Sequence, residues 1–176
     1  MGQLLNSLAA IYSTVGGAAT DFESIATVTV GAGGATSISF SSIPSTYKHL
    51  QLRCYAVVGS GTNFNMRYNS DTGANYAYHQ IYGTGATVGT GNSASITNIP
   101  FMYQGGVGAT IVDILDYSSS NKNKTSRSLD GYDANGSGSI AFWSGLWMST
   151  SAINSLTIQG GTFNQNSVFA LYGIKG

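Results

Sequence analysis

The stretch that decides the fold is His49-Leu50-Gln51-Leu52-Arg53-Cys54-Tyr55-Ala56-Val57-Val58, where polar and apolar side chains alternate. A period of two is typical of a β-strand with one buried face. The residues expected to face the core are Leu50, Leu52, Cys54, Ala56 and Val58. Cys54 belongs to this set, so we expect a small buried hydrophobic residue and no nucleophile. It is the only cysteine, which excludes an internal disulfide.

Segments of similar character continue on both sides of this strand, separated by turns rich in Gly, Asn and Ser. The expected strands are 25–30, 36–40, 64–68, 76–82, 94–103, 109–117, 125–132, 139–148, 153–159 and 168–174. We expect the first two to form a β-hairpin around residues 31–34, and residues 133–138 to close a second hairpin. Residues 83–93 are expected to be a loop, and Pro100 indicates a sheet edge or a bulge.

This succession of short strands predicts an all-β fold of one domain. We expect an antiparallel β-sandwich of jelly-roll type, because the strand number and the length of 176 residues suit two packed four-stranded sheets. The predicted organisation is an N-terminal arm over residues 1–21 and a β-sandwich domain over residues 22–176.

The arm contains the one segment with helical periodicity, residues 3–13. Its apolar side chains fall on one helical face: Leu4, Leu5, Leu8, Ile11 and Tyr12. One hypothesis is that these five residues anchor the protein on a partner. The alternatives are a short helix packed on its own domain and a frayed terminus.

The low charge of the chain limits its possible partners. Charged residues make up 8% of the sequence, with seven basic and seven acidic side chains and a formal net charge of zero. This balance argues against nucleic acid as a partner and does not support binding to an anionic membrane. No apolar stretch is long enough for a membrane helix, and the N-terminus lacks the basic region of a signal peptide. Either polar uncharged residues keep the surface soluble, or partner subunits cover much of it.

Residues that could carry out catalysis or bind metal lack the partners they need. His49 and His79 have no metal-ligand spacing, and a single cysteine excludes a zinc site of the usual kind. Asp113 and Asp116 are expected on opposite faces of a strand, in salt bridges or turns, and not as a catalytic pair. We therefore expect no enzyme, no catalytic residue, no cofactor and no metal.

One loop has a partial calcium-binding pattern. Asp133-x-Asn135-x-Ser137-Gly138 matches the beginning of a calcium loop, but the twelfth position is Ser144 where the motif needs a bidentate Glu. A tight β-turn is the preferred interpretation.

Aromatic residues are the most abundant candidates for recognition. Tyr76, Tyr78 and Tyr82 share one face of a predicted strand, and Trp143 and Trp147 lie on another. Three interpretations are open: packing in the core, contact between subunits, and a platform that binds sugars.

Several sequence segments together resemble a family of small virion proteins of tailed bacteriophages. They are residues 22–31 (FESIATVTVG), 42–53 (SIPSTYKHLQLR), 68–76 (YNSDTGANY), 113–117 (DILDY), 123–125 (NKT) and 169–176 (FALYGIKG). The resemblance runs from Phe22 to the last residue and implies a structural protein of the virion, with no catalytic residues to carry over.

The first expectation from this resemblance is a capsid decoration (cement) protein, a homo-oligomer and specifically a trimer. It would be made in the host cytoplasm and would bind the major capsid protein or other virion proteins at the capsid surface. The second expectation is a head- or tail-fibre module that binds host-surface glycan.

Overall fold

The computed structural model describes residues 21–59 and 61–176. The expected helix and the candidate anchor residues Leu4, Leu5, Leu8, Ile11 and Tyr12 lie outside the described residues. Twelve strands make up the described chain: β1 (Phe22–Thr29), β2 (Ala35–Phe40), β3 (His49–Val57), β4 (Thr62–Tyr68), β5 (Tyr76–Gly83), β6 (Val88–Ile96), β7 (Ile99–Gln104), β8 (Val107–Leu115), β9 (Lys124–Asp133), β10 (Gly138–Trp147), β11 (Leu156–Phe163) and β12 (Val168–Ile174).

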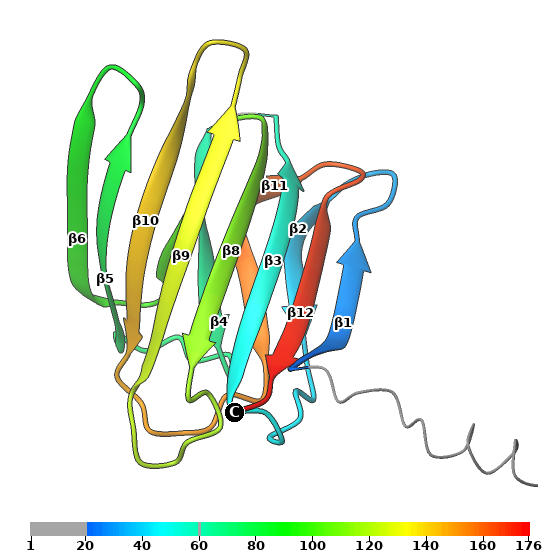
Figure 1. Cartoon of the computed structure of the whole chain (residues 1–176), viewed down its shortest axis with the longest axis vertical. Coiled ribbons are helices and arrows are strands. Elements are labelled where there is room, and N and C mark those ends of the chain that lie inside the picture. Colours follow the sequence, from blue (N-terminus) through cyan, green and yellow to red (C-terminus); the bar gives the residue numbers. More distant parts are fainter. Residues whose placement is uncertain (1–20, 60) are drawn as a thin grey trace, which may run out of the picture.

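These strands form two antiparallel sheets that pack as a sandwich, which confirms the predicted fold class (Figure 1). The large sheet has eight strands in the order β1-β12-β3-β8-β9-β10-β5-β6, and the small sheet has four in the order β2-β11-β4-β7. The expected division into two four-stranded sheets is therefore wrong, and the jelly-roll topology stays a prediction.

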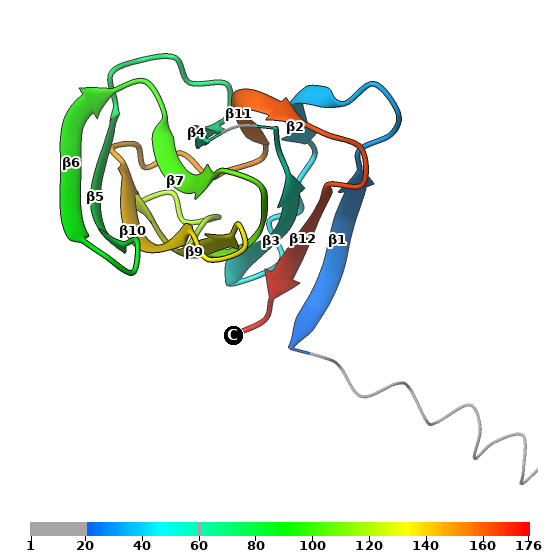
Figure 2. The same ribbon diagram turned by 90° about the horizontal axis from the view of Figure 1, so that it is seen from above.

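The large sheet curls at one end. Seen from above, its β9-β10-β5-β6 half bends around β7, the last strand of the small sheet (Figure 2). β7 contacts β9 and β10 most extensively among the strands of the large sheet. The curl thus places β9 and β10 against β7 of the small sheet.

The core lies between the sheets and follows the alternation seen in the sequence. In β3, Leu50, Leu52, Cys54 and Ala56 are all buried, as predicted. Burial raises the pKa of the Cys54 thiol far above its ordinary value, which keeps it protonated and unreactive. β3 is paired with β12 on one side and β8 on the other, so its buried face lies deep within the sheet.

The predicted hairpin of residues 25–30 and 36–40 is wrong. β1 pairs with β12 in the large sheet, whereas β2 pairs with β11 in the small sheet. The chain changes sheet just after β1, where Val30 donates a backbone hydrogen bond to Ser167 and accepts one from Asn166. These contacts with the loop before β12 replace the pairing that a local hairpin would have supplied.

The predicted loop at residues 83–93 is also wrong, because most of it belongs to β6. This strand carries few apolar residues, and glycine at its inward positions lets side chains of β5 lie across it. A Cβ on Gly89 would overlap the ring of Tyr82, and one on Gly91 would crowd Gln80. A glycine-rich edge strand therefore packs on its neighbour without having an apolar face of its own.

The predicted strand at residues 94–103 is divided between the two sheets. β6 ends at Ile96 in the large sheet, and β7 begins at Ile99 in the small one. The pairing of β7 with β4 shifts next to Pro100, leaving Phe101 as an extra residue. This confirms the edge or bulge expected at Pro100.

The predicted hairpin at residues 133–138 is confirmed. β9 and β10 pair antiparallel along their whole length, and their turn closes with a backbone hydrogen bond of 2.8 Å from Ala134 to Ser137. Asp133 Oδ1 accepts the backbone N–H of Asn135, whose φ is positive at 56°. The partial calcium pattern thus belongs to a tight turn.

Candidate functional site

The outer face of the large sheet carries a row of exposed apolar side chains. Ile111, Leu129, Phe142 and Ile81 are direct cross-strand partners on β8, β9, β10 and β5. Their exposed fractions are 45%, 52%, 48% and 51%. We call these four residues the apolar ladder. Single exposed apolar residues are normal, but a contiguous group is typical of a protein–protein contact surface.

The ladder borders a shallow depression of about 290 Å³ on the same face. Ile140 and Val88, exposed by 59% and 79%, lie beside the ladder at this depression. Sequence reasoning missed this surface, although a signal was present. Most outward positions of β8 and β10 are apolar as well as the inward ones, which exceeds what a half-buried strand requires.

The part of the outer face next to the ladder is polar, because Arg53 of β3 is the cross-strand partner of Ile111. Gln51 Nε2 donates to Asp113 Oδ1 at 2.8 Å, and Arg53 Nε donates to Gln51 Oε1 at 2.7 Å. The Arg53 guanidinium also lies 5.0 Å from the centre of the Tyr172 ring. The polar side chains of this part are thus bonded to one another, whereas the apolar ladder offers an apolar surface to a protein partner.

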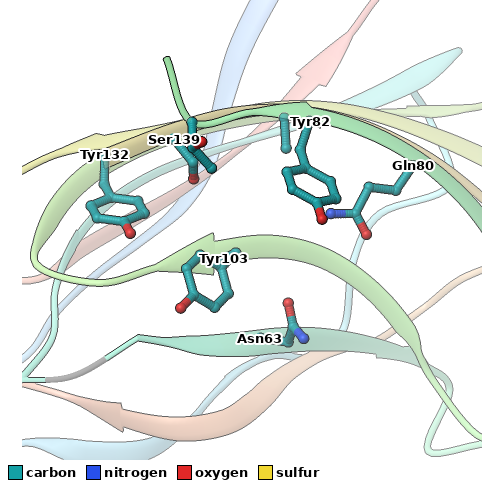
Figure 3. A pocket seen from close by; sticks show the side chains of 8 residues that line it. Asn63, Gln80, Tyr82, Tyr103, Tyr132 and Ser139 are labelled. Atoms are coloured by element: carbon teal, nitrogen blue, oxygen red, sulfur yellow. The ribbon is translucent and has the colours of Figure 1, made fainter. Parts of the chain in front are cut away.

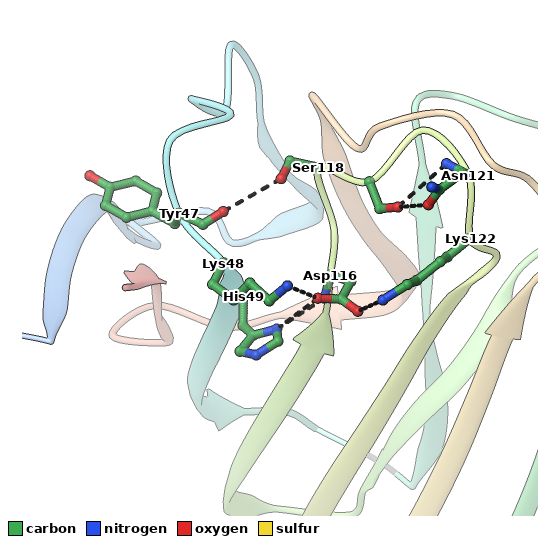
Figure 4. A network of polar contacts seen from close by, with 8 residues as sticks. Tyr47, Lys48, His49, Asp116, Ser118, Asn121 and Lys122 are labelled. Atoms are coloured by element: carbon green, nitrogen blue, oxygen red, sulfur yellow. Dashed lines mark hydrogen bonds and ion pairs between the residues drawn. The ribbon is translucent and has the colours of Figure 1, made fainter. Parts of the chain in front are cut away.

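Asp116 holds a charged network at one end of the sandwich (Figure 4). Lys48 Nζ lies 2.9 Å and Lys122 Nζ 2.7 Å from its carboxylate. Hydrogen bonds from Lys122 and Lys48 hold the pKa of Asp116 far below its usual range. The backbone N–H of Asp116 donates to His49 Nδ1 at 3.0 Å. Asp116 therefore has the strand-end salt-bridge role expected from the sequence, while Asp113 lies apart on the outer face.

The inner face of β9 is unexpectedly polar. Its buried side chains are Lys124, Ser126, Ser128 and Asp130. Two of them bind the backbone of β7: Ser128 Oγ donates to the Phe101 carbonyl at 2.7 Å, and Asp130 Oδ2 accepts the Tyr103 N–H at 2.8 Å. β7 has a strand partner on one edge only, so these side chains satisfy its other edge.

Asp130 is the central residue of this buried polar group. Its Oδ1 accepts hydrogen bonds from Gln104 Nε2 at 2.6 Å and from Thr110 Oγ1 at 2.8 Å. Burial raises the pKa of Asp130 to about 6, although these hydrogen bonds oppose the shift. The sequence did not predict that this face of β9 is buried, because serine and aspartate are typical of exposed positions.

The predicted aromatic candidates divide between core and surface. Tyr76, Trp143 and Trp147 are buried, and the Tyr78 ring lies 5.8 Å from that of Trp143. Trp147 Nε1 donates to Asp71 Oδ2 at 2.7 Å, which ties the end of β10 to the loop before β5. Of the three interpretations of the aromatic residues, packing in the core therefore applies to these.

Tyr82 instead lines a pocket at one end of the curled half of the sandwich (Figure 3). The pocket has a volume of about 400 Å³, within the range of ~300–1,000 Å³ typical of small-molecule sites. Strands of both sheets contribute to it. The lining residues are Asn63, Gln80, Tyr82, Thr84, Tyr103, Tyr132, Ser139 and Ala141. Sequence reasoning named only Tyr82 among them, because the pocket joins strands that are distant in the sequence.

Other classes of site find little support in the described chain. Over residues 21–59 and 61–176, no three His, Cys, Asp or Glu side chains come together as metal ligands would. His79 is exposed on β5. The same residues include no helix with the length and hydropathy needed to cross a bilayer.

Comparisons with protein-family models, curated proteins and solved structures find no match to this chain.

Proposed function

We propose that the protein is a bacteriophage virion structural protein that decorates and stabilises the exterior of the capsid. The observation that carries the proposal is the apolar ladder, a contiguous uncharged surface on the outer face of the large sheet. The sequence segments that resemble virion proteins support a phage virion as the assembly to which the protein binds. The partner is an apolar surface of the assembled shell, formed by the major capsid protein.

A decoration protein acts through preferential binding. If it binds the assembled shell and not the free subunits, binding lowers the free energy of the shell by mass action. The neutral chain offers little long-range attraction, so the contact depends on apolar burial and shape. We also propose that the protein is a trimer and that residues 1–20 anchor it on the shell.

The first test is cosedimentation of the purified protein with virions from which it has been stripped. We expect saturable binding by the wild type and loss of binding in a double variant, Leu129→Lys with Phe142→Lys, because burying two unpaired charges is costly. Ser24→Lys is the matched control, since Ser24 is exposed on β1 at the far edge of the same sheet. Full binding by a folded double variant would contradict the ladder as the docking surface.

A second test concerns the N-terminal segment. Deletion of residues 1–20 is expected to abolish shell binding and to leave the thermal unfolding of the β-sandwich cooperative. Retained binding by the truncated protein would refute the anchor and leave the ladder as the sole contact.

A fibre module that binds host-surface glycan is the second candidate, and the pocket lined by Tyr82, Tyr103 and Tyr132 favours it. Immunogold labelling of intact virions separates the two. Label over the head, with a copy number comparable to that of the major capsid protein, supports decoration. Label confined to fibres, with a handful of copies, supports the alternative.

A further inference from the structure

We propose that the pocket between the two sheets binds a neutral saccharide, with room for more than one sugar unit. We call it the tyrosine pocket, after Tyr82, Tyr103 and Tyr132. The inference gives the second candidate function a site and a ligand class, and it does not depend on where the protein lies in a virion.

The pocket exists because the packing of the curled half changes towards its end. Asp130 on β9 lies opposite Ala141, and further inside Trp143 of β10 is buried in the space between the sheets. At the next positions outward, Ala141 and Ser139 are too small to fill it. The large rings of Tyr82 and Tyr132 stand on either side of these small residues, so the pocket is open between them (Figure 3).

Glycines leave space for the three rings. A Cβ on Gly89 would overlap the Tyr82 ring, and a Cβ on Gly105 would press into the Tyr132 ring. A Cβ on Gly61 would overlap the Tyr103 hydroxyl. Each ring thus lies against bare backbone. Rings that are fixed before a ligand arrives lose less conformational entropy on binding.

The ring arrangement suits a sugar. Figure 3 shows Tyr82 and Tyr132 on one side of the pocket and Tyr103 on the other, at β7. The centres of the Tyr103 and Tyr132 rings lie 5.8 Å apart, and their planes are inclined by 52°. The face of an aromatic ring is electron-rich and attracts the C–H groups on one face of a pyranose, while the phenol hydroxyl stays available for hydrogen bonds.

The polar lining selects a neutral ligand with many hydroxyl groups. Gln80 and Asn63 each offer both a donor and an acceptor, and Ser139 and Thr84 add hydroxyls. The lining contains no carboxylate, ammonium or guanidinium group, so nothing in it would pair with a phosphate, a sulfate or a uronic acid. A purely apolar ligand would leave the two carboxamides without partners.

A second depression extends the site. It has a volume of about 250 Å³ and lies beside the turn of residues 133–138. It shares Thr84, Tyr132 and Ser139 with the tyrosine pocket, so the two are adjacent, and Asp133 contributes the one carboxylate among its lining residues. A chain of two or three sugar units would therefore span both, with one unit between the tyrosine rings.

The test is isothermal titration calorimetry with three neutral probes, maltotriose, mannotriose and triacetylchitotriose, followed by an array of neutral and acidic bacterial surface glycans. We expect saturable binding to at least one neutral oligosaccharide. Tyr82→Ala should weaken it about tenfold or more, because a stacking ring is lost. Tyr55→Ala, which removes an exposed tyrosine on the outer face of β3, should leave the affinity unchanged.

A second variant distinguishes loss of binding from loss of folding. Asn63 is exposed on β4, so Asn63→Ala should keep the fold and still weaken binding. Binding to acidic glycans alone, affinity unaffected by both Tyr82→Ala and Asn63→Ala, or no binding to any neutral glycan on the array would each overturn the proposal. None of these outcomes bears on shell binding through the apolar ladder.

Discussion

At the scale of single residues, Asp130 is the side chain whose environment departs most from its sequence character. Its pKa is raised to about 6 by burial, from an ordinary value of 3.8. Between these values the folded protein keeps a proton that the unfolded chain releases. Its contribution to stability is therefore present below about pH 4 and is lost as the pH rises through about 6.

This predicts the pH dependence of Asp130→Asn. The amide stays neutral, and its nitrogen can donate to Gln104 once the Gln104 carboxamide turns over, because Gln104 Nε2 faces Asp130 and Oε1 has no partner in the described structure. Relative to the wild type, the variant should gain about 1–3 kcal/mol in free energy of unfolding between about pH 4 and pH 7. Urea unfolding of both proteins across this range measures the gain.

Asp113→Asn is the control, because it removes a carboxylate from the outer face of β8. Three further carboxylates, Glu23, Asp71 and Asp116, have lowered pKa values and are present in all three proteins. Their pH dependence therefore cancels in the comparison. A difference between wild type and Asp130→Asn that stays constant with pH would contradict the raised pKa.

At the scale of elements, the edge of β7 that has no strand partner forms its hydrogen bonds with side chains of β9. Phe101 is the extra residue of the bulge opposite β4, and its carbonyl accepts the Ser128 hydroxyl. The two sheets are therefore joined by hydrogen bonds as well as by apolar packing. This arrangement also covers an edge that could otherwise pair with another chain.

Ser128→Ala should leave the Phe101 carbonyl buried without this partner. We expect a loss of about 1–3 kcal/mol in the free energy of unfolding, measured by urea titration. Ser144→Ala on the outer face of β10 is the matched control and should change stability by less than about 0.5 kcal/mol. Equal effects of the two substitutions would show that β7 does not rely on the Ser128 hydroxyl.

At the scale of the whole molecule, the apolar ladder and the zero net charge predict how binding responds to salt. Ionic screening weakens contacts between charges and leaves apolar contacts almost unchanged. Shell binding should therefore persist from low to high sodium chloride, and ammonium sulfate should strengthen it. Cosedimentation at several salt concentrations measures this. A steep fall with sodium chloride would indicate a charged contact away from the ladder.

The sequence alone determined most of the strands, although not β6, because alternation with a period of two is a local property. The run from Leu50 to Val58 predicted a half-buried strand, the buried Cys54 and the β-sandwich class. The turn at residues 133–138 and the irregularity at Pro100 were equally local, and both were predicted correctly.

Only the tertiary structure decided which strands pair and what their faces meet. β1 pairs with β12 from the far end of the chain, which no local pattern near residues 31–34 could reveal. β6 is a strand because Tyr82 and Gln80 of β5 lie across its glycines, and Asp130 is buried because β7 covers it. The apolar ladder and the tyrosine pocket arise in the same way: each needs side chains from several strands, and pairing between distant segments brings them together.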